Sequence, residues 1–104
     1  MTATEINKAI AEICDWYPYQ DADNKTRWKN RVTKSDEDEC PNYYGDLNAM
    51  HEAENGMNQH KTGAYNRILF NIVKDTTPNK YWWHATAPQR CEAFLRTFDK
   101  WESE

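Results

Sequence analysis

The segment 46–60 holds the densest set of side chains that could do chemistry, with two histidines and three carboxylates in fifteen residues. Its run HEAEN differs by one residue from HExxH, the zinc-protease motif in which two histidines four positions apart bind one metal from adjacent helical turns. Here Asn55 occupies the position of the second histidine, and His60 lies beyond a glycine that should end the helix carrying His51. The spacing therefore excludes that zinc site, and we expect neither a metal ion nor another cofactor.

Glu54 is the carboxylate of this segment whose direction demands a partner. At about 100° per residue, one face of the predicted helix collects the apolar residues Leu47, Met50, Ala53 and Met57. Glu54 lies at the edge of that face, whereas Glu52 points nearly opposite and is expected to be solvated. A half-buried carboxylate needs a partner, and the candidates on other helices are Arg67, Arg90 and Arg96. We favour a structural ion pair; the alternative is a carboxylate in a ligand pocket.

A second candidate is a basic segment at 25–32. Lys25, Arg27, Lys29 and Arg31 alternate there with Thr26, Trp28, Asn30 and Val32. A basic side chain at every second residue predicts a strand with one basic face and one Trp/Val face. The basic face could hold phosphate or an acidic protein surface. We favour a solvated face that the acidic run SDEDE (35–39) neutralises, because the net charge of the chain is −4.

The third candidate is a group of aromatic and histidine side chains just before predicted helix starts, where backbone N–H groups can bind anions. Its members are Tyr43, Tyr44, Trp82, Trp83 and His84. Leu, Ile, Val and Phe together number only 13 residues, whereas Trp, Tyr and Phe number 14. We therefore favour core packing for these rings, which replace the missing aliphatic side chains.

The remaining composition narrows the class of protein. A chain of 104 residues with no linker or repeat predicts one domain, 1–104. Unassisted electrostatic binding to nucleic acid is not expected of an acidic chain. Cys14, Cys40 and Cys91 are odd in number and form no CxxC, so we expect no disulfide framework. No apolar stretch reaches membrane-spanning length and no signal-peptide pattern is present, which favours a soluble, cytosolic protein.

The predicted elements are four helices and about three strands. The first helix is expected at 5–14, with Thr2 and Glu5 as a capping box or Thr4 as N-cap, and the second at 46–56 after an Asp46 N-cap. The third is expected around an apolar stripe at 65–73, and the fourth begins after a Thr86 N-cap. That last helix has its buried stripe at Cys91, Phe94, Leu95 and Phe98. Strands are expected at 16–20, 25–32 and 80–86, the first two as a hairpin, with an acidic loop at 35–39. The pattern predicts an α+β domain in which the helices cover a small antiparallel sheet.

Two blocks, PNYYGDLNAMHEAE (41–54) and ATAPQRCEAFLRTFDKWE (85–102), resemble the phage ABA sandwich domain, a family of small proteins encoded by tailed phages and prophages. The resemblance covers most of the chain. It implies an α-β-α sandwich, a phage or prophage source and action in the cytoplasm of a bacterial host. It brings no catalytic residues. The residues that match the recurring blocks are Asp46, Asn48, His51, Glu54, Thr86, Arg90 and Arg96.

The leading functional hypothesis is a non-enzymatic phage accessory protein that binds a host or phage protein, with a host-takeover or anti-defence role. A second is a small-molecule or nucleotide binder that sequesters a host defence signal, with aromatic rings stacking on a base and arginines holding phosphates. A hydrolase using Glu54 and His51 ranks last, because the helical wheel separates the two by about 60°. Homo-oligomerisation would support so small a core. The candidate binding residues are His51, Glu54, Arg90, Arg96, Trp83, His84, Arg27, Lys29 and Arg31.

Overall fold

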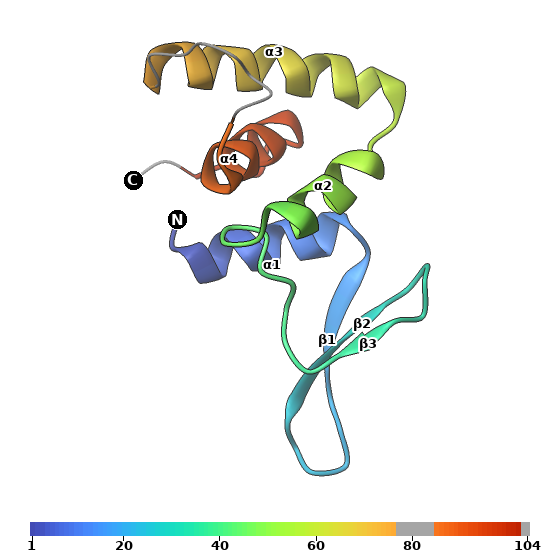
Figure 1. The fold of residues 1–104 in the computed structure, drawn as a ribbon. Coiled ribbons are helices and arrows are strands. Elements are labelled where there is room, and N and C mark those ends of the chain that lie inside the picture. Colours follow the sequence, from blue (N-terminus) through green and yellow to red (C-terminus); the bar gives the residue numbers. More distant parts are fainter. Residues whose placement is uncertain (77–84, 103–104) are drawn as a thin grey trace.

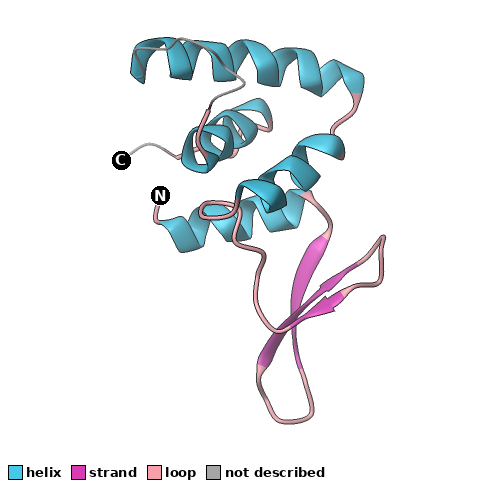
Figure 2. Cartoon of the chain, in the orientation of Figure 1, coloured by secondary structure: helices cyan, strands magenta, loops and turns pink. Residues whose placement is uncertain are grey.

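The computed structural model of the 104-residue chain describes residues 1–76 and 85–102. Its element order is α1 (Ala3–Ile13), β1 (Trp16–Gln20), β2 (Thr26–Asn30), β3 (Asp36–Glu37), α2 (Leu47–Asn55), α3 (Gln59–Thr76) and α4 (Ala87–Thr97). Four helices and a three-stranded antiparallel sheet of order β1-β2-β3 confirm the predicted α+β class. Figure 2 shows how the two kinds of element are separated in space.

Local capping chemistry fixes where the helices begin. Thr2 Oγ1 accepts from Glu5 N (3.2 Å) and Glu5 Oε1 accepts from Thr2 N (3.0 Å), which is the predicted capping box rather than a Thr4 cap. The bonds with Thr2 lower the pKa of Glu5. The predicted Asp46 cap is confirmed by its bond from Asn48 N (3.0 Å), and Thr86 caps α4 in a second capping box.

The sheet differs from its prediction at β3 and at the end of β2. β1 and β2 pair as the predicted hairpin, from Trp16↔Asn30 to Gln20↔Thr26. β3 lies inside the segment predicted as an acidic loop, where two exposed residues pair with Trp28 and Lys29. Most of the strand predicted at 80–86 lies outside the described residues, and its last two positions, Ala85 and Thr86, are not in a strand.

Asn30 ends β2 earlier than predicted. Its Oδ1 accepts from Val32 N and Thr33 N, and its Nδ2 donates to Cys14 O, each at 2.9 Å. These bonds fold the chain into the turn before β3 and tie that turn to the end of α1. Val32 therefore lies in the turn with 70% of its surface exposed, and the prediction that it shares one face of the strand with Trp28 is wrong.

The helices pack chiefly on one another around α4, which contacts α1, α2 and α3, and the sheet extends from one side of this helical body (Figure 1). Of the helices, α1 makes the clearest contact with the sheet. The predicted stripes of α3 and α4 lie inside, with Leu69, Val73, Cys91, Phe94 and Leu95 at most 1% exposed. Trp28 of β2 and Tyr43 of the segment between β3 and α2 extend the core toward the sheet.

Candidate functional site

Three helices bring four polar side chains together around Glu54, and we call His51, Glu54, Tyr65 and Arg90 the Glu54 cluster. Arg90 Nη1 of α4 donates to Glu54 Oε2 at 2.8 Å. The Tyr65 hydroxyl of α3 donates to the same oxygen. His51 Nδ1, one turn earlier on α2, lies 3.0 Å from Glu54 Oε1. Both carboxylate oxygens are therefore engaged.

The Glu54 cluster has the geometry of a closed structural pair. The side chains of Arg90 and Glu54 are 6% and 13% exposed, and Arg90 Nε also donates to Ala85 O at 3.1 Å. Burial, followed by the hydrogen bond to Glu54, raises the pKa of Tyr65, so its hydroxyl stays protonated and remains a donor. Of the three predicted partners of Glu54, Arg90 is the one that the structure pairs with it.

The other two arginines lie elsewhere. Arg67 is exposed on α3. Arg96 Nε donates to Glu92 Oε2 at 3.0 Å along α4, and its guanidinium lies 5.7 Å from the centroid of the Trp101 ring. The structure therefore does not bring Arg96 and Arg90 into one anion site.

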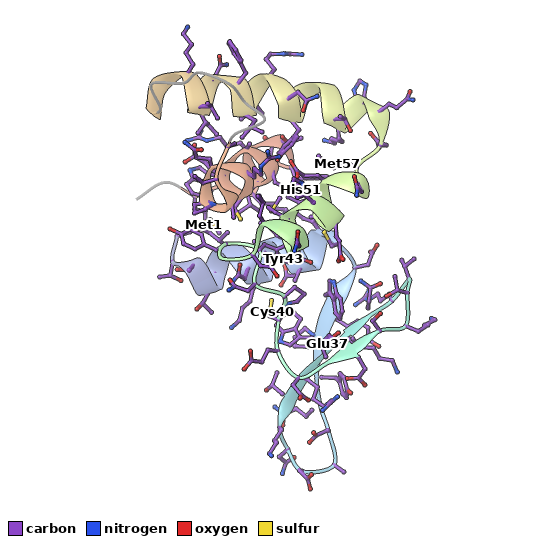
Figure 3. All side chains as sticks on the ribbon, in the orientation of Figure 1. Met1, Glu37, Cys40, Tyr43, His51 and Met57 are labelled. Carbon is purple, nitrogen blue, oxygen red and sulfur yellow. The ribbon has the colours of Figure 1, made fainter. Side chains whose placement is uncertain are left out.

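His51 and Glu54 are in contact, although the helical wheel separates them by about 60°. Residues three positions apart on a helix are neighbours, and His51 does reach Glu54. The His51 side chain, labelled on α2 in Figure 3, is half exposed, but each Glu54 oxygen already has a partner. Within the described segments, no group of three His, Cys, Asp or Glu side chains is placed to hold a metal ion.

The basic strand carries an ion-pair network on one face. Arg27 Nε donates to Asp36 Oδ1 (3.0 Å) and to the Tyr19 hydroxyl (3.3 Å), and Nη1 pairs with Asp38. The Tyr19 hydroxyl donates to Asp36 Oδ2 at 2.6 Å. The Tyr19 bond and the neighbouring Arg27 lower the pKa of Asp36. The interpretation that the acidic run neutralises this strand is confirmed for Arg27.

The same face carries further rings and cations. Strand partners share a side of a sheet, so the pairs Tyr17↔Lys29, Tyr19↔Arg27 and Lys29↔Asp36 place these five side chains together. Arg31, just beyond β2, stacks on Tyr17 with 4.9 Å between the guanidinium carbon and the ring centroid. We call this surface, Tyr17, Tyr19, Arg27, Lys29, Arg31 and Asp36, the tyrosine–arginine face.

The third predicted site is only partly described. Tyr43 is 4% exposed and belongs to the core, as the packing interpretation predicts, whereas Tyr44 is 39% exposed. Figure 3 labels Tyr43 where the chain crosses from the sheet to α2. Trp82, Trp83 and His84 lie outside the described residues.

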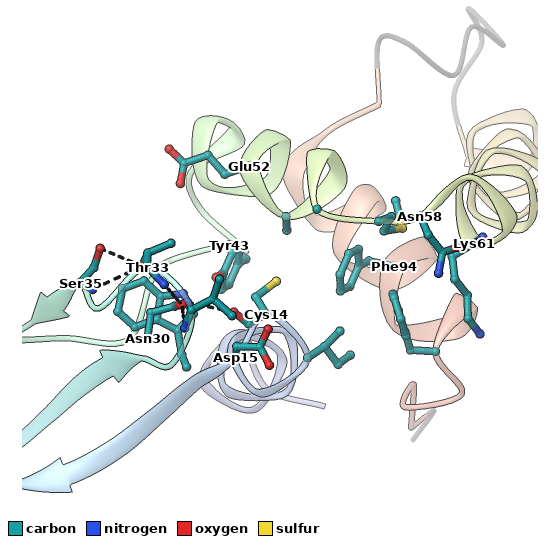
Figure 4. A pocket seen from close by; sticks show the side chains of 17 residues that line it. Cys14, Asp15, Asn30, Thr33, Ser35, Tyr43, Glu52, Asn58, Lys61 and Phe94 are labelled. Carbon is teal, nitrogen blue, oxygen red and sulfur yellow. Dashed lines mark hydrogen bonds between the residues drawn. The ribbon is translucent and has the colours of Figure 1, made fainter.

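Sequence reasoning missed a cleft of about 580 Å³ between the hairpin and the helical body (Figure 4). The end of α1, the β2–β3 turn, the α2–α3 corner and α4 form its walls. Apolar side chains dominate the lining, among them Ile13, Trp16, Met57, Phe94 and Phe98. Because the lining comes from segments far apart in the chain, no local sequence pattern predicts this cleft.

Most polar groups of the cleft serve the fold. Asn30 holds the turn, Thr33 Oγ1 donates to Ser35 Oγ at 3.0 Å, and Asn58 Oδ1 accepts from Lys61 N at 2.9 Å. Burial raises the pKa of the Cys14 thiol to about 11, so it is protonated at neutral pH and is a poor nucleophile. Neither Glu54 nor Arg90 lines the cleft.

None of the described helices combines the length and apolar character that a membrane crossing requires. No family model matches the sequence, and no curated protein or solved structure matches it significantly.

Proposed function

We propose that this chain is a small non-catalytic protein that acts by binding another protein through its tyrosine–arginine face. The observation that carries the proposal is the two-sided character of the sheet. Trp28 and Asn30 on one side are 6% and 5% exposed and belong to the packed interior. The opposite side presents rings and cations on a sheet that extends from the helical body (Figure 1).

The composition of that face suits a protein partner. Tyrosine and arginine are enriched at the centres of protein–protein interfaces, where they supply large contact areas and directed hydrogen bonds. Arg31 is already stacked on Tyr17, and Arg27 is held by Tyr19 and Asp36. Side chains ordered before binding lose less conformational entropy on association.

The free edge of β1 is a less suitable docking surface than the face. Asp15 O accepts from Arg31 N (2.9 Å) and Asp21 N donates to Lys25 O (3.0 Å). Because bonded residues alternate along an antiparallel pair, the backbone groups of the odd-numbered β1 residues point toward β2. The backbone nitrogen of Pro18 then faces outward. Its missing N–H leaves the ladder intact and hinders pairing with a strand from another chain.

The alternative functions have less support from the geometry. A nucleotide site built on Arg90 and Arg96 would need both to be available, but Arg90 pairs with Glu54 and Arg96 with Glu92. A hydrolase would need Glu54 to reach a substrate, but its oxygens contact His51, Tyr65 and Arg90. The resemblance to phage ABA sandwich proteins supports a setting in the cytoplasm of an infected or lysogenic bacterium, with a host or phage protein as the partner.

Photocrosslinking in that setting tests the proposal. A p-benzoylphenylalanine in place of Lys29 is expected to capture one protein that the same replacement of Lys74, exposed on α3, does not capture. With the purified partner, Tyr17→Ala and Arg31→Ala should each weaken binding at least about thirtyfold, the loss typical of a hot-spot residue. Tyr44→Ala, another exposed tyrosine, should leave the Kd unchanged.

Two results would contradict the proposal. One is identical crosslinked products from positions 29 and 74. The other is a reconstituted complex whose Kd changes less than twofold in both Tyr17→Ala and Arg31→Ala while circular dichroism shows that both variants are folded.

A further inference from the structure

We infer that the cleft between the hairpin and the helical body is a binding site for a small, singly charged organic anion, a carboxylate on an aliphatic or aromatic body. Trp16 and Asn30, which pair with each other in the sheet, line the cleft. They lie on the side opposite the tyrosine–arginine face, so this site is separate from the proposed protein-binding surface and does not depend on it.

The lining is suited to an apolar body. Ile13 of α1, Trp16 of β1 and Met57 at the α2–α3 corner are half-buried and line the cleft from three parts of the chain. Phe98, beyond the end of α4, adds a ring packed 4.9 Å from Phe94 between centroids. A volume of about 580 Å³ falls within the range of pockets that enclose small organic ligands. Burial of the ligand's apolar surface would supply most of the affinity.

Lys61 supplies the positive charge. Its Nζ lies 5.2 Å from the centroid of the Phe98 ring, and its residue is half-buried. Among the described residues it forms no ion pair with a carboxylate. An ammonium beside an apolar surface gains a charge-assisted hydrogen bond when a carboxylate comes within reach. The ligand's anionic group is therefore placed at Lys61 and its apolar body toward the half-buried Ile13 and Met57.

The lining that the described residues form carries two carboxylates and one ammonium, so an anion can bind only at Lys61, and a ligand with more than one negative charge is disfavoured. Asp15 and Glu52 line the cleft and are exposed, and neither pairs with a cation within the described ranges. Like charges repel, so a nucleoside di- or triphosphate would meet two carboxylates and only one ammonium. The Asn30 amide, the Thr33 hydroxyl and Asn58 Oδ1 are engaged in the fold's own hydrogen bonds, and Lys61 is the cationic residue of the lining that orients the ligand.

Titration of the full chain with defined probes tests this site. Decanoate and 1-naphthoate are expected to bind saturably with one site per chain, measured by calorimetry and by shifts in the amide NMR signals of Ile13, Met57 and Phe98. Acetate, which has the charge without the apolar body, should bind at least about tenfold more weakly because it buries little apolar surface. Decylammonium, which has the opposite charge, should also bind at least about tenfold more weakly because it loses the charge-assisted hydrogen bond to Lys61. ADP should also bind more weakly than decanoate.

Charge variants assign the anion to Lys61. Lys61→Gln should weaken decanoate binding about tenfold, and Lys61→Glu should reverse the preference so that decylammonium binds better than decanoate. Lys74→Gln, which removes an exposed ammonium from the same helix, is the matched control and should bind like the parent. Unchanged far-ultraviolet circular dichroism verifies that each variant is folded.

The inference is wrong if decanoate and 1-naphthoate fail to saturate, or if Lys61→Gln binds them as the parent does. Tighter binding of decylammonium or ADP than of decanoate by the parent chain would also overturn it, because either result assigns the cleft a different class of ligand. Failure here would leave the crosslinking experiment unaffected, since positions 29 and 74 lie outside the cleft.

Discussion

Glu54 illustrates at the scale of one residue how burial selects a partner. A carboxylate that is 13% exposed needs other groups to replace the hydrogen bonds with water that it has lost. Arg90 and Tyr65 do so at one oxygen and His51 at the other. Since these groups come from α2, α3 and α4, the cluster also fixes the three helices relative to one another. Its contacts and burial are those of a structural ion pair.

Removing Arg90 should therefore be costly. Arg90→Leu is expected to lower the free energy of unfolding by about 3 kcal/mol, because Glu54 keeps a buried charge without its cation. Arg96→Leu, which removes an arginine from an exposed pair on the same helix, should cost less than about 1 kcal/mol. Urea unfolding followed by tryptophan fluorescence measures both. Equal losses in the two variants would show that the Glu54 pair is no more important than a surface pair.

The sequence predicted part of this cluster. The helical wheel identified Glu54 as the carboxylate that needed a partner, and Arg90 was among three candidates. Tyr65 was assigned only to the apolar stripe of α3. Its ring does pack inside, edge-on to Phe94 with 6.4 Å between centroids, while its hydroxyl reaches Glu54. A wheel that sorts residues into apolar and polar misses a side chain that is both.

At the scale of elements, capping residues and turn residues set what can be predicted. Each of the three N-cap residues, Thr2, Asp46 and Thr86, accepts a hydrogen bond from a backbone N–H two or three residues later. A helix start of this kind can be predicted from the local sequence. β3 is different, because Asp36 and Glu37 have low strand propensity. They pair with β2 because the hydrogen bonds of Asn30 return the chain to that position.

Two glycines give a matched test of how well the elements are packed. A Cβ at Gly63, inside α3, would meet nothing within 4 Å, so Gly63→Ala should raise the free energy of unfolding by about 0.8 kcal/mol through helix propensity. A Cβ at Gly45 would lie 2.6 Å from Asn42 Nδ2. Asn42 Oδ1 accepts from Asn7 of α1 and from Gly45 N, both at 3.1 Å.

Gly45→Ala should therefore displace the Asn42 amide and lower the free energy of unfolding by about 1 kcal/mol. Thermal and urea unfolding of the two variants, measured side by side, show whether each substitution raises or lowers the free energy of unfolding. A destabilising Gly63→Ala would mean that α3 has a neighbour on that side, and a neutral Gly45→Ala would mean that the Asn42 amide can move freely.

At the scale of the whole molecule, the helices form most of the core and the hairpin contributes little to it. Trp28 is the principal side chain that the sheet places in the core, and β3 is only two residues long. Small isolated sheets are marginally stable in water. The cleft lies at this junction, and its shape depends on how the hairpin is held against the helices. Sequence patterns describe each element but not the angle between them, which explains why the cleft was not predicted.

The attachment of the hairpin should be visible in hydrogen exchange. Backbone amides of Arg27 and Lys29 in β2 are expected to exchange through openings of lower free energy than that of Leu95, which is fully buried in α4. Asn30→Ala removes the bonds to Cys14 O, Val32 N and Thr33 N, and should lower the β2 opening free energy by about 2 kcal/mol.

Leu95 should be affected less by that substitution, because α4 packs on the other helices and not on the turn. Asn71→Ala, which replaces an exposed asparagine on α3, should leave both regions unchanged. If the amides of β2 and Leu95 instead share one opening free energy and fall together in Asn30→Ala, the hairpin and the helices unfold as a single unit. The cleft would then be a rigid cavity whose ligand affinity follows global stability. If the opening free energies of β2 and of Leu95 differ, ligand binding across the cleft should slow exchange in β2 more than in α4, because the ligand would contact both the hairpin and the helices.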